Sequence, residues 1–167
     1  MFVNLINRIR SIIFSYKASF ITTKFMQSVE SEGRLLEAIE SLKRMPEKQI
    51  VKLGRLNNIS AWECVLEEVV DTDHEIEYYC KFVNELYARG YTEDHIREMR
   101  KIAWETAGWF NYEMMAWDWC GLDEKDMKLG LEDKYSKRVI TSEEYRCINK
   151  TIEKYETVHR FVYLPFS

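Results

Sequence analysis

Residues 103–121 carry the sequence feature that most constrains the fold. They read AWETAGWFNYEMMAWDWCG and hold four of the five tryptophans in the chain. The polar side chains in this stretch are few: Glu105, Thr106, Asn111, Glu113 and Asp118. A helix that is apolar around most of its circumference is buried around most of it. We therefore expect this stretch at the centre of the fold, either as a core helix or as the floor of a binding site.

Residues that break helices are scarce in this chain. Its 167 residues include two prolines and six glycines, and the segments between them place apolar residues at steps of three and four. That spacing is typical of amphipathic helices. A β-sandwich of this length would need many more turn residues. Because 167 residues most simply make one domain, we expect residues 1–167 to form a single-domain all-α bundle.

A long antiparallel helix pair is predicted at the centre of this bundle of five or six helices. Apolar spacing predicts one helix over 61–89 and a second, aromatic one over 93–120. Gly90 is suited to end the first helix, and Thr92 is suited to begin the second. Because only about two residues separate the two helices, we expect them to lie side by side.

Shorter helices are predicted on either side of this pair. The apolar spacing indicates helices over 32–45 and 47–56. A capping box, in which Thr141 pairs with Glu144, predicts the start of the last helix. Residues 122–140 are polar and contain a glycine, so we expect an irregular connector there.

The first 29 residues differ in charge from the rest of the chain. They contain four basic side chains and no acid, so the net charge of −4 leaves −8 on the remainder. Their apolar spacing predicts an amphipathic first helix with a basic outer face. Two alternatives to a packed helix are open. The segment could contact an anionic membrane surface, or it could be an organellar leader. The residues that would contact a membrane are Arg8, Arg10, Lys17 and Lys24.

The acidic body of the chain argues against direct DNA binding. Neutralising phosphates requires clustered Lys and Arg, whereas an acidic surface favours solubility and basic protein partners. The four cysteines are Cys64, Cys80, Cys120 and Cys147, and no two form a CxxC pair. This usage predicts reduced thiols in a cytoplasmic protein.

Glu67, Glu68 and Asp71 place two or three carboxylates on one helical face. Such a face can bind Mg²⁺ when a facing helix adds another acid, and Glu113 is placed to do so. The pattern resembles the first motif of the all-α nucleotide pyrophosphohydrolases, where an E-E-x-x-E helix faces an E-x-x-D helix. That resemblance implies a metal-dependent hydrolase. In this chain Asp71 stands where the motif has its third Glu, and the second motif is missing. A solvated acidic face is the other interpretation.

The aromatic helix divides into stripes on a helical wheel. One stripe holds Trp104 and Asn111, another holds Trp109 and Glu105, and a single antiparallel neighbour cannot cover both. Because tryptophan, tyrosine and methionine are enriched at interface hot spots, these stripes predict a binding surface or an additional part of the core. The predicted binding surface is Trp104, Glu105, Trp109, Asn111, Tyr112, Met115, Asp118 and Trp119.

The function predicted from the sequence is binding rather than catalysis. No GxSxG elbow, phosphate loop or dinucleotide fingerprint is present, and no cofactor or metal is expected. We expect a small intracellular acidic protein that regulates or inhibits a protein partner by engaging or occluding it. The metal-dependent hydrolase and a peripheral membrane protein are the alternatives.

Overall fold

The structure is a computed structural model that describes residues 26–70, 74–114 and 121–161, and these described residues contain no strand. The all-α helical bundle predicted from the sequence is confirmed. The described elements are α2 (Arg34–Arg44), α3 (Glu47–Leu53), α4 (Ala61–Leu66), α5 (Ile76–Ala88), α6 (Glu93–Ala103), the π-helical turn η1 (Trp104–Gly108), α7 (Trp109–Met114), α8 (Glu124–Ser136) and α9 (Ser142–Phe161). The four basic residues predicted to contact a membrane lie outside the described residues.

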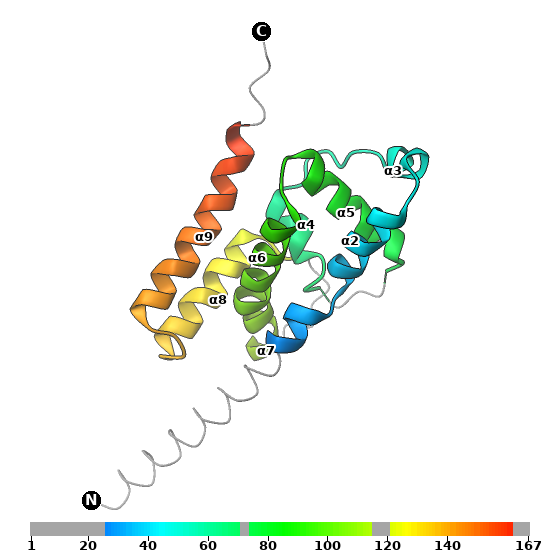
Figure 1. Ribbon diagram of the computed structural model, residues 1–167. Helices are drawn as coiled ribbons and strands as arrows, with labels where there is room; N and C mark the ends of the chain where they lie inside the picture. Colours follow the sequence, from blue (N-terminus) through cyan, green and yellow to red (C-terminus); the bar gives the residue numbers. More distant parts are fainter. Residues whose placement is uncertain (1–25, 71–73, 115–120, 162–167) are drawn as a thin grey trace, which may run out of the picture.

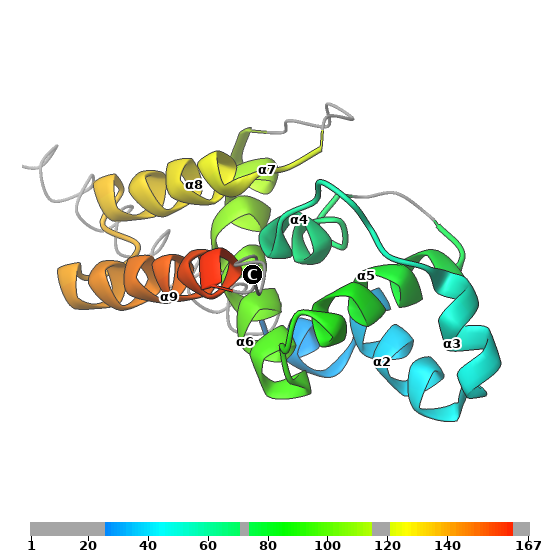
Figure 2. The same cartoon turned by 90° about the horizontal axis from the view of Figure 1, so that it is seen from above.

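The helices form two groups on either side of a central column. Helices α6, η1 and α7 follow one another along this column (Figure 1). On one side α8 packs against η1 and α7, and α9 packs against α8 (Figure 2). On the other side α5 packs against α2 and α3, while α4 contacts α5, α6 and α9. The central column is therefore covered by different helices on its two sides.

The hydrophobic core extends through both groups. Helix α2 buries the apolar face predicted for residues 32–45, namely Leu35, Leu36, Ala38, Ile39 and Leu42. Between the groups, Trp62 of α4 is buried, and its indole N–H donates to the carbonyl of Ile152 at 3.3 Å. The Trp62 ring also meets Tyr155 edge to face, so α4 and α9 pack directly against each other.

The helix expected over 61–89 is divided into α4 and α5. Helix α4 packs against α6, whereas the main neighbour of α5 is α2. The Tyr78 hydroxyl donates to the carboxylate of Glu67 at 2.9 Å, so the start of α5 is tied back to the end of α4. Helix α5 buries one face at steps of three and four, whereas α4 is buried at five of its six residues.

The turn between α5 and α6 matches the prediction closely. Gly90 has a φ of 87°, and its amide donates to the Tyr87 carbonyl at 2.9 Å while the Tyr91 amide donates to the Leu86 carbonyl at 3.1 Å. These two hydrogen bonds define a Schellman motif. Thr92 then accepts from the His95 amide at the start of α6. The end of α5 and the start of α6 are therefore both confirmed.

The expected connector over 122–140 contains helix α8. Asp123 caps this helix by accepting from the amides of Lys125 and Asp126. The side that faces η1 holds Met127 and Leu131, but also Gly130 and Lys134, all of them buried. A buried face that includes a glycine and a lysine gives a weak amphipathic pattern, and this explains why the sequence did not indicate a helix.

Helix α8 ends in a second Schellman motif with an arginine in the left-handed position. Arg138 has a φ of 57°, and the Val139 amide donates to the Lys134 carbonyl at 2.9 Å. An L-residue pays a steric penalty in this conformation that glycine avoids. The backbone at Arg138 is therefore locally strained.

We expect Arg138→Gly to raise the free energy of unfolding by about 0.5–1 kcal/mol, after allowing for the extra freedom of glycine in the unfolded chain. Urea denaturation followed by circular dichroism measures the change. Lys137→Gly is the matched control, because Lys137 has an ordinary φ of −79° and should lose stability. A loss of stability in both variants would rule out the left-handed conformation at Arg138.

Candidate functional site

The predicted aromatic helix contains a π-helical turn at its centre. In an uninterrupted α-helix the Trp109 amide would donate to the Glu105 carbonyl, four residues earlier. In η1 the Trp109 amide also contacts the Thr106 carbonyl, three residues earlier, whereas the defining bonds of a π-helix span five residues. The Glu105 carbonyl accepts a hydrogen bond from the side-chain ammonium of Lys134, with Nζ and O 3.1 Å apart. Turns of this kind occur frequently at functional sites.

Lys134 reaches this carbonyl from α8 and is almost completely buried. Lys134 is 5% exposed, and its Nζ lies 5.5 Å from the ring centroid of Trp109. Burial lowers the pKa of Lys134, although the negative charges of Glu105 and Glu144 act in the opposite direction. A carbonyl oxygen and an aromatic face are both favourable neighbours for a cation. These neighbours therefore offset part of the cost of burying the ammonium group at the contact between α8 and η1.

The Trp109 side chain is also held by α8. Its indole N–H donates to Oδ2 of Asp133 at 3.0 Å, and the same carboxylate oxygen lies 2.8 Å from Nζ of Lys137. Hydrogen bonds from Lys137 and Trp109 lower the pKa of Asp133. The Trp109 residue nevertheless remains only half-buried. Its ring is consequently fixed in direction while part of it faces solvent.

Gly130 explains how α8 comes close enough to make these contacts. A Cβ at this position would lie 2.1 Å from the carbonyl oxygen of Thr106 and 3.2 Å from Cβ of Phe110. The backbone of α8 therefore packs directly on η1, and no larger residue fits. Thr106 is itself buried and donates its hydroxyl to the Ile102 carbonyl at 2.6 Å.

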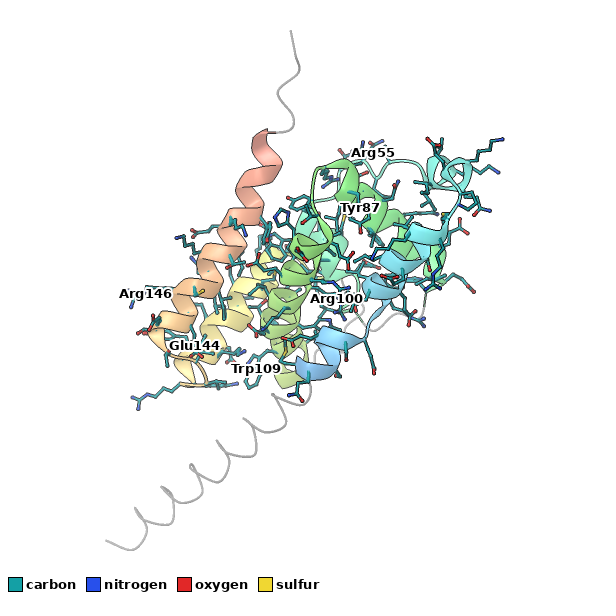
Figure 3. All side chains as sticks on the ribbon, in the orientation of Figure 1. Arg55, Tyr87, Arg100, Trp109, Glu144 and Arg146 are labelled. Atoms are coloured by element: carbon teal, nitrogen blue, oxygen red, sulfur yellow. The ribbon has the colours of Figure 1, made fainter. Side chains whose placement is uncertain are left out.

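An exposed leucine lies beside Asp133, the residue that accepts the Trp109 indole hydrogen bond. Leu129 is 52% exposed and lies one helical turn before Asp133, so the two side chains are neighbours on α8. Figure 3 labels Trp109 at the lower end of the central column, beside α8. We call the patch formed by Glu105, Trp109, Leu129 and Asp133 the Trp109 surface.

The structure separates the residues of the predicted binding surface. Trp109 and Glu105 meet α8, whereas Trp104 packs against the core and against Gly108, where an added Cβ would lie 2.9 Å from the indole and 3.5 Å from Val69. Asn111 is half-buried on α7. Tyr112 belongs to α7. The other predicted members, Met115, Asp118 and Trp119, lie outside the described residues.

Three residues of this site were missed by sequence reasoning. Leu129, Asp133 and Lys134 all lie on α8, in the segment expected to be an irregular connector. The available signal was Asp123 three residues before Asp126, which forms a capping box and begins α8.

The two adjacent acids of the predicted metal site have different partners. Glu68 forms an ion pair with Arg100 at 2.5 Å, and both side chains are 4% exposed. Glu67 accepts from the Tyr78 hydroxyl instead. Asp71 lies outside the described residues and Glu113 is on α7, with only its backbone described. No group of three or more potential metal ligands occurs among the described side chains.

Arg100 also connects this ion pair to the segment before α2. Its guanidinium donates to the carbonyls of Val29 and Glu32, and Figure 3 shows it between α6 and α2. Gly33 lies directly over the pair, with a φ of 149°, and a Cβ there would lie 1.9 Å from Oε1 of Glu68. The pair is therefore a structural connection among α6, the end of α4 and residues 29–33.

A second buried carboxylate, Glu85, joins α5 to the loop after α3. It accepts hydrogen bonds from Nε of Arg55 at 2.7 Å, the Leu56 amide at 3.0 Å and Nε of Arg89 at 2.7 Å. Burial alone would raise the pKa of Glu85, but these donors outweigh it and lower the pKa to about 2. Glu85 therefore stabilises the fold in its ionised form.

This arrangement predicts acid sensitivity. A carboxylate with a lowered pKa contributes stability that is present above its unfolded pKa of about 4.5 and is lost as the pH falls towards about 2. The shift corresponds to about 3 kcal/mol. Urea denaturation at successive pH values should show Glu85→Gln far less stable than the parent at pH 6, with the difference narrowing towards pH 2. A difference independent of pH would contradict this role.

The cysteines described by the structure are free thiols. Cys64 and Cys80 are buried and Cys147 is exposed, while Cys120 lies outside the described residues. Burial raises the pKa of the Cys64 thiol to about 12. Cys64 is therefore a protonated part of the core at neutral pH rather than a reactive thiolate.

No family model, curated protein or solved structure matches the chain. Within the described ranges, none of the helices has the length and apolarity required to cross a bilayer.

Proposed function

We propose that this chain is a small, acidic, intracellular binding protein that engages a protein partner through the Trp109 surface and regulates that partner by occluding part of it. The observation that carries the proposal is the state of Trp109, whose ring is held by Asp133 and Lys134 yet is only half-buried. Tryptophan is enriched among residues that dominate binding energy. A side chain already fixed in direction loses little conformational entropy when it binds.

The charges around Trp109 indicate the chemistry of the partner. Two acids, Glu105 and Asp133, lie near the ring together with two lysines, Lys134 and Lys137, and Leu129 adds exposed apolar area. The chain as a whole has a net charge of −4. Complementary potentials favour association, so the proposed partner presents an apolar side chain flanked by Lys or Arg.

Trp109→Ala is expected to weaken partner binding about 30-fold, which corresponds to roughly 2 kcal/mol for a central anchor residue. Titration calorimetry against a partner co-purified from the source cells in stoichiometric amount measures the change. Tyr135→Ala is the matched control, because Tyr135 is an exposed aromatic on α8 but outside the Trp109 surface. Equal affinity of Trp109→Ala and the parent for that partner would contradict the proposal, as would failure to recover any stoichiometric partner.

A further inference from the structure

We infer that the outward face of α3, formed by Lys48, Val51 and Lys52, is a docking surface for an anionic membrane. Helix α3 turns its other side to the core, where Leu53 is buried and Ile50 is partly buried. Successive residues of a helix are turned by about 100°, so Lys48 lies opposite this apolar side, with Val51 and Lys52 on either side of it. All three residues of this face are exposed. We call them the α3 face.

The charge around the α3 face is opposite to that of the chain as a whole. Residues 43–55 contain five basic side chains and one acid, whereas the whole chain has a net charge of −4. The basic side chains at the two ends of this segment, Lys43 and Arg55, are paired with carboxylates. Within the part of the chain that the structure describes, Lys48 and Lys52 take part in no ion pair. The α3 face therefore presents positive charge that the fold does not neutralise.

The residues of the α3 face do not stabilise the helix that carries them. Lys48 and Lys52 are four residues apart, so their like charges repel each other along the helix. Val51 is 74% exposed, the highest fraction among the exposed large apolar side chains that the structure describes. Valine has a lower helix propensity than lysine or alanine, and no burial offsets that cost here. Residues that break local rules in this way are expected at functional sites.

An exposed apolar side chain between two lysines fits the interface of an anionic bilayer. Lysine ammonium groups are attracted to anionic lipids, while an apolar side chain is buried at the boundary of headgroups and acyl chains. A nucleic acid backbone would satisfy the lysines but would leave Val51 in water. A protein partner typically covers about 800 Å² on each side, more than three side chains of a seven-residue helix supply.

The α3 face lies far from the Trp109 surface. Figures 1 and 2 both place α3 at one end of the molecule and α8 at the other. A membrane bound at α3 would therefore leave the Trp109 surface open to a partner. Membrane binding does not depend on the proposed function, because the two surfaces share no residue. Trp109→Ala should accordingly bind vesicles as the parent does, so the two proposals can fail separately.

Flotation of the full chain with vesicles tests the charge of the α3 face. The parent should bind vesicles of phosphatidylcholine with phosphatidylserine, and not vesicles of phosphatidylcholine alone. Lys48→Gln with Lys52→Gln should bind about 30-fold more weakly, because each lysine at an anionic surface contributes a factor of about five. Lys125→Gln with Lys150→Gln is the matched control, since it removes the same charge from exposed positions on α8 and α9. This control should stay within about twofold of the parent.

Substitutions at Val51 test the apolar contribution. Val51→Leu adds one CH₂ group and should strengthen vesicle binding about fourfold, whereas Val51→Ser should weaken it about tenfold. Because Val51 is exposed, neither change should unfold the chain, and circular dichroism checks this. An increase in binding for Val51→Leu is a result that damage to the fold would not produce.

Three results would overturn the membrane assignment. The first is equal vesicle binding by the parent and by Lys48→Gln with Lys52→Gln, which would assign any binding to other basic residues. The second is a Val51 series without effect, which would reduce the contact to charge alone. The third is a parent that binds polyglutamate but no anionic vesicle, which would assign the α3 face to an acidic protein.

Discussion

Replacing Arg100 with methionine is expected to lower the free energy of unfolding by about 3–5 kcal/mol. The substitution leaves the carboxylate of Glu68 buried without its counter-ion, which is the costly way to break such a pair. It also removes the donors to the Val29 and Glu32 carbonyls. Urea denaturation measures the loss, and hydrogen exchange should show the amides of residues 29–33 opening at lower free energy than in the parent.

The double variant Glu68→Met with Arg100→Met distinguishes the energy of the ion pair from the effect of lost side-chain packing. Replacing both members of a buried pair by apolar residues is often nearly neutral, so we expect the double variant to regain most of the stability lost by Arg100→Met. The Val29 and Glu32 carbonyls would still lack a donor, which sets the remaining deficit. A double variant no more stable than Arg100→Met would show that Glu68 and Arg100 are not energetically coupled.

Gly130→Ala is expected to lower the free energy of unfolding by about 3 kcal/mol, near the upper end of the usual cost of inserting a group into a packed contact. The added Cβ would lie 2.1 Å from a backbone oxygen, so α8 would have to move away from η1. The direction of the change in stability separates two effects. Replacing a helical glycine by alanine without a steric conflict raises stability by about 1 kcal/mol, so a loss of stability reports the clash.

Gly121→Ala is the control for this substitution, since a Cβ at Gly121 would meet nothing within 4 Å. It should therefore change stability by less than about 0.5 kcal/mol. The free energies of both variants come from thermal and urea unfolding followed by circular dichroism. A stabilised Gly130→Ala would show that α8 does not pack directly against η1.

Local signals in the sequence predicted the parts of the fold that depend on neighbouring residues. The amphipathic α2, the Schellman motif at Gly90 and the capping box of Thr141 with Glu144 are each visible within a few residues. The division between α4 and α5 could not be predicted from such local signals. It depends on which helix covers each apolar face, and periodicity does not contain that information.

The candidate site was predicted in part for a similar reason. Trp109 and Glu105 were recognised because an aromatic surplus is visible in the sequence itself. Their partners, Asp133 and Lys134, were missed because a buried lysine reads as a surface residue when the chain alone is considered. The ion pair of Glu68 with Arg100 spans 32 positions, and its formation depends on how α4 and α6 pack.

Site-specific photocrosslinking in the source cells tests the central claim most directly. A benzophenone amino acid placed at Leu129 lies within the Trp109 surface, whereas the same group at Val51 lies on α3, where the side chain is 74% exposed. We predict one stoichiometric crosslinked protein from position 129 and none from position 51, and we predict that Trp109→Ala removes the product. Equal crosslinking from both positions, or a product from position 129 that survives Trp109→Ala, would contradict the claim that Trp109 is the anchor of a partner-binding surface.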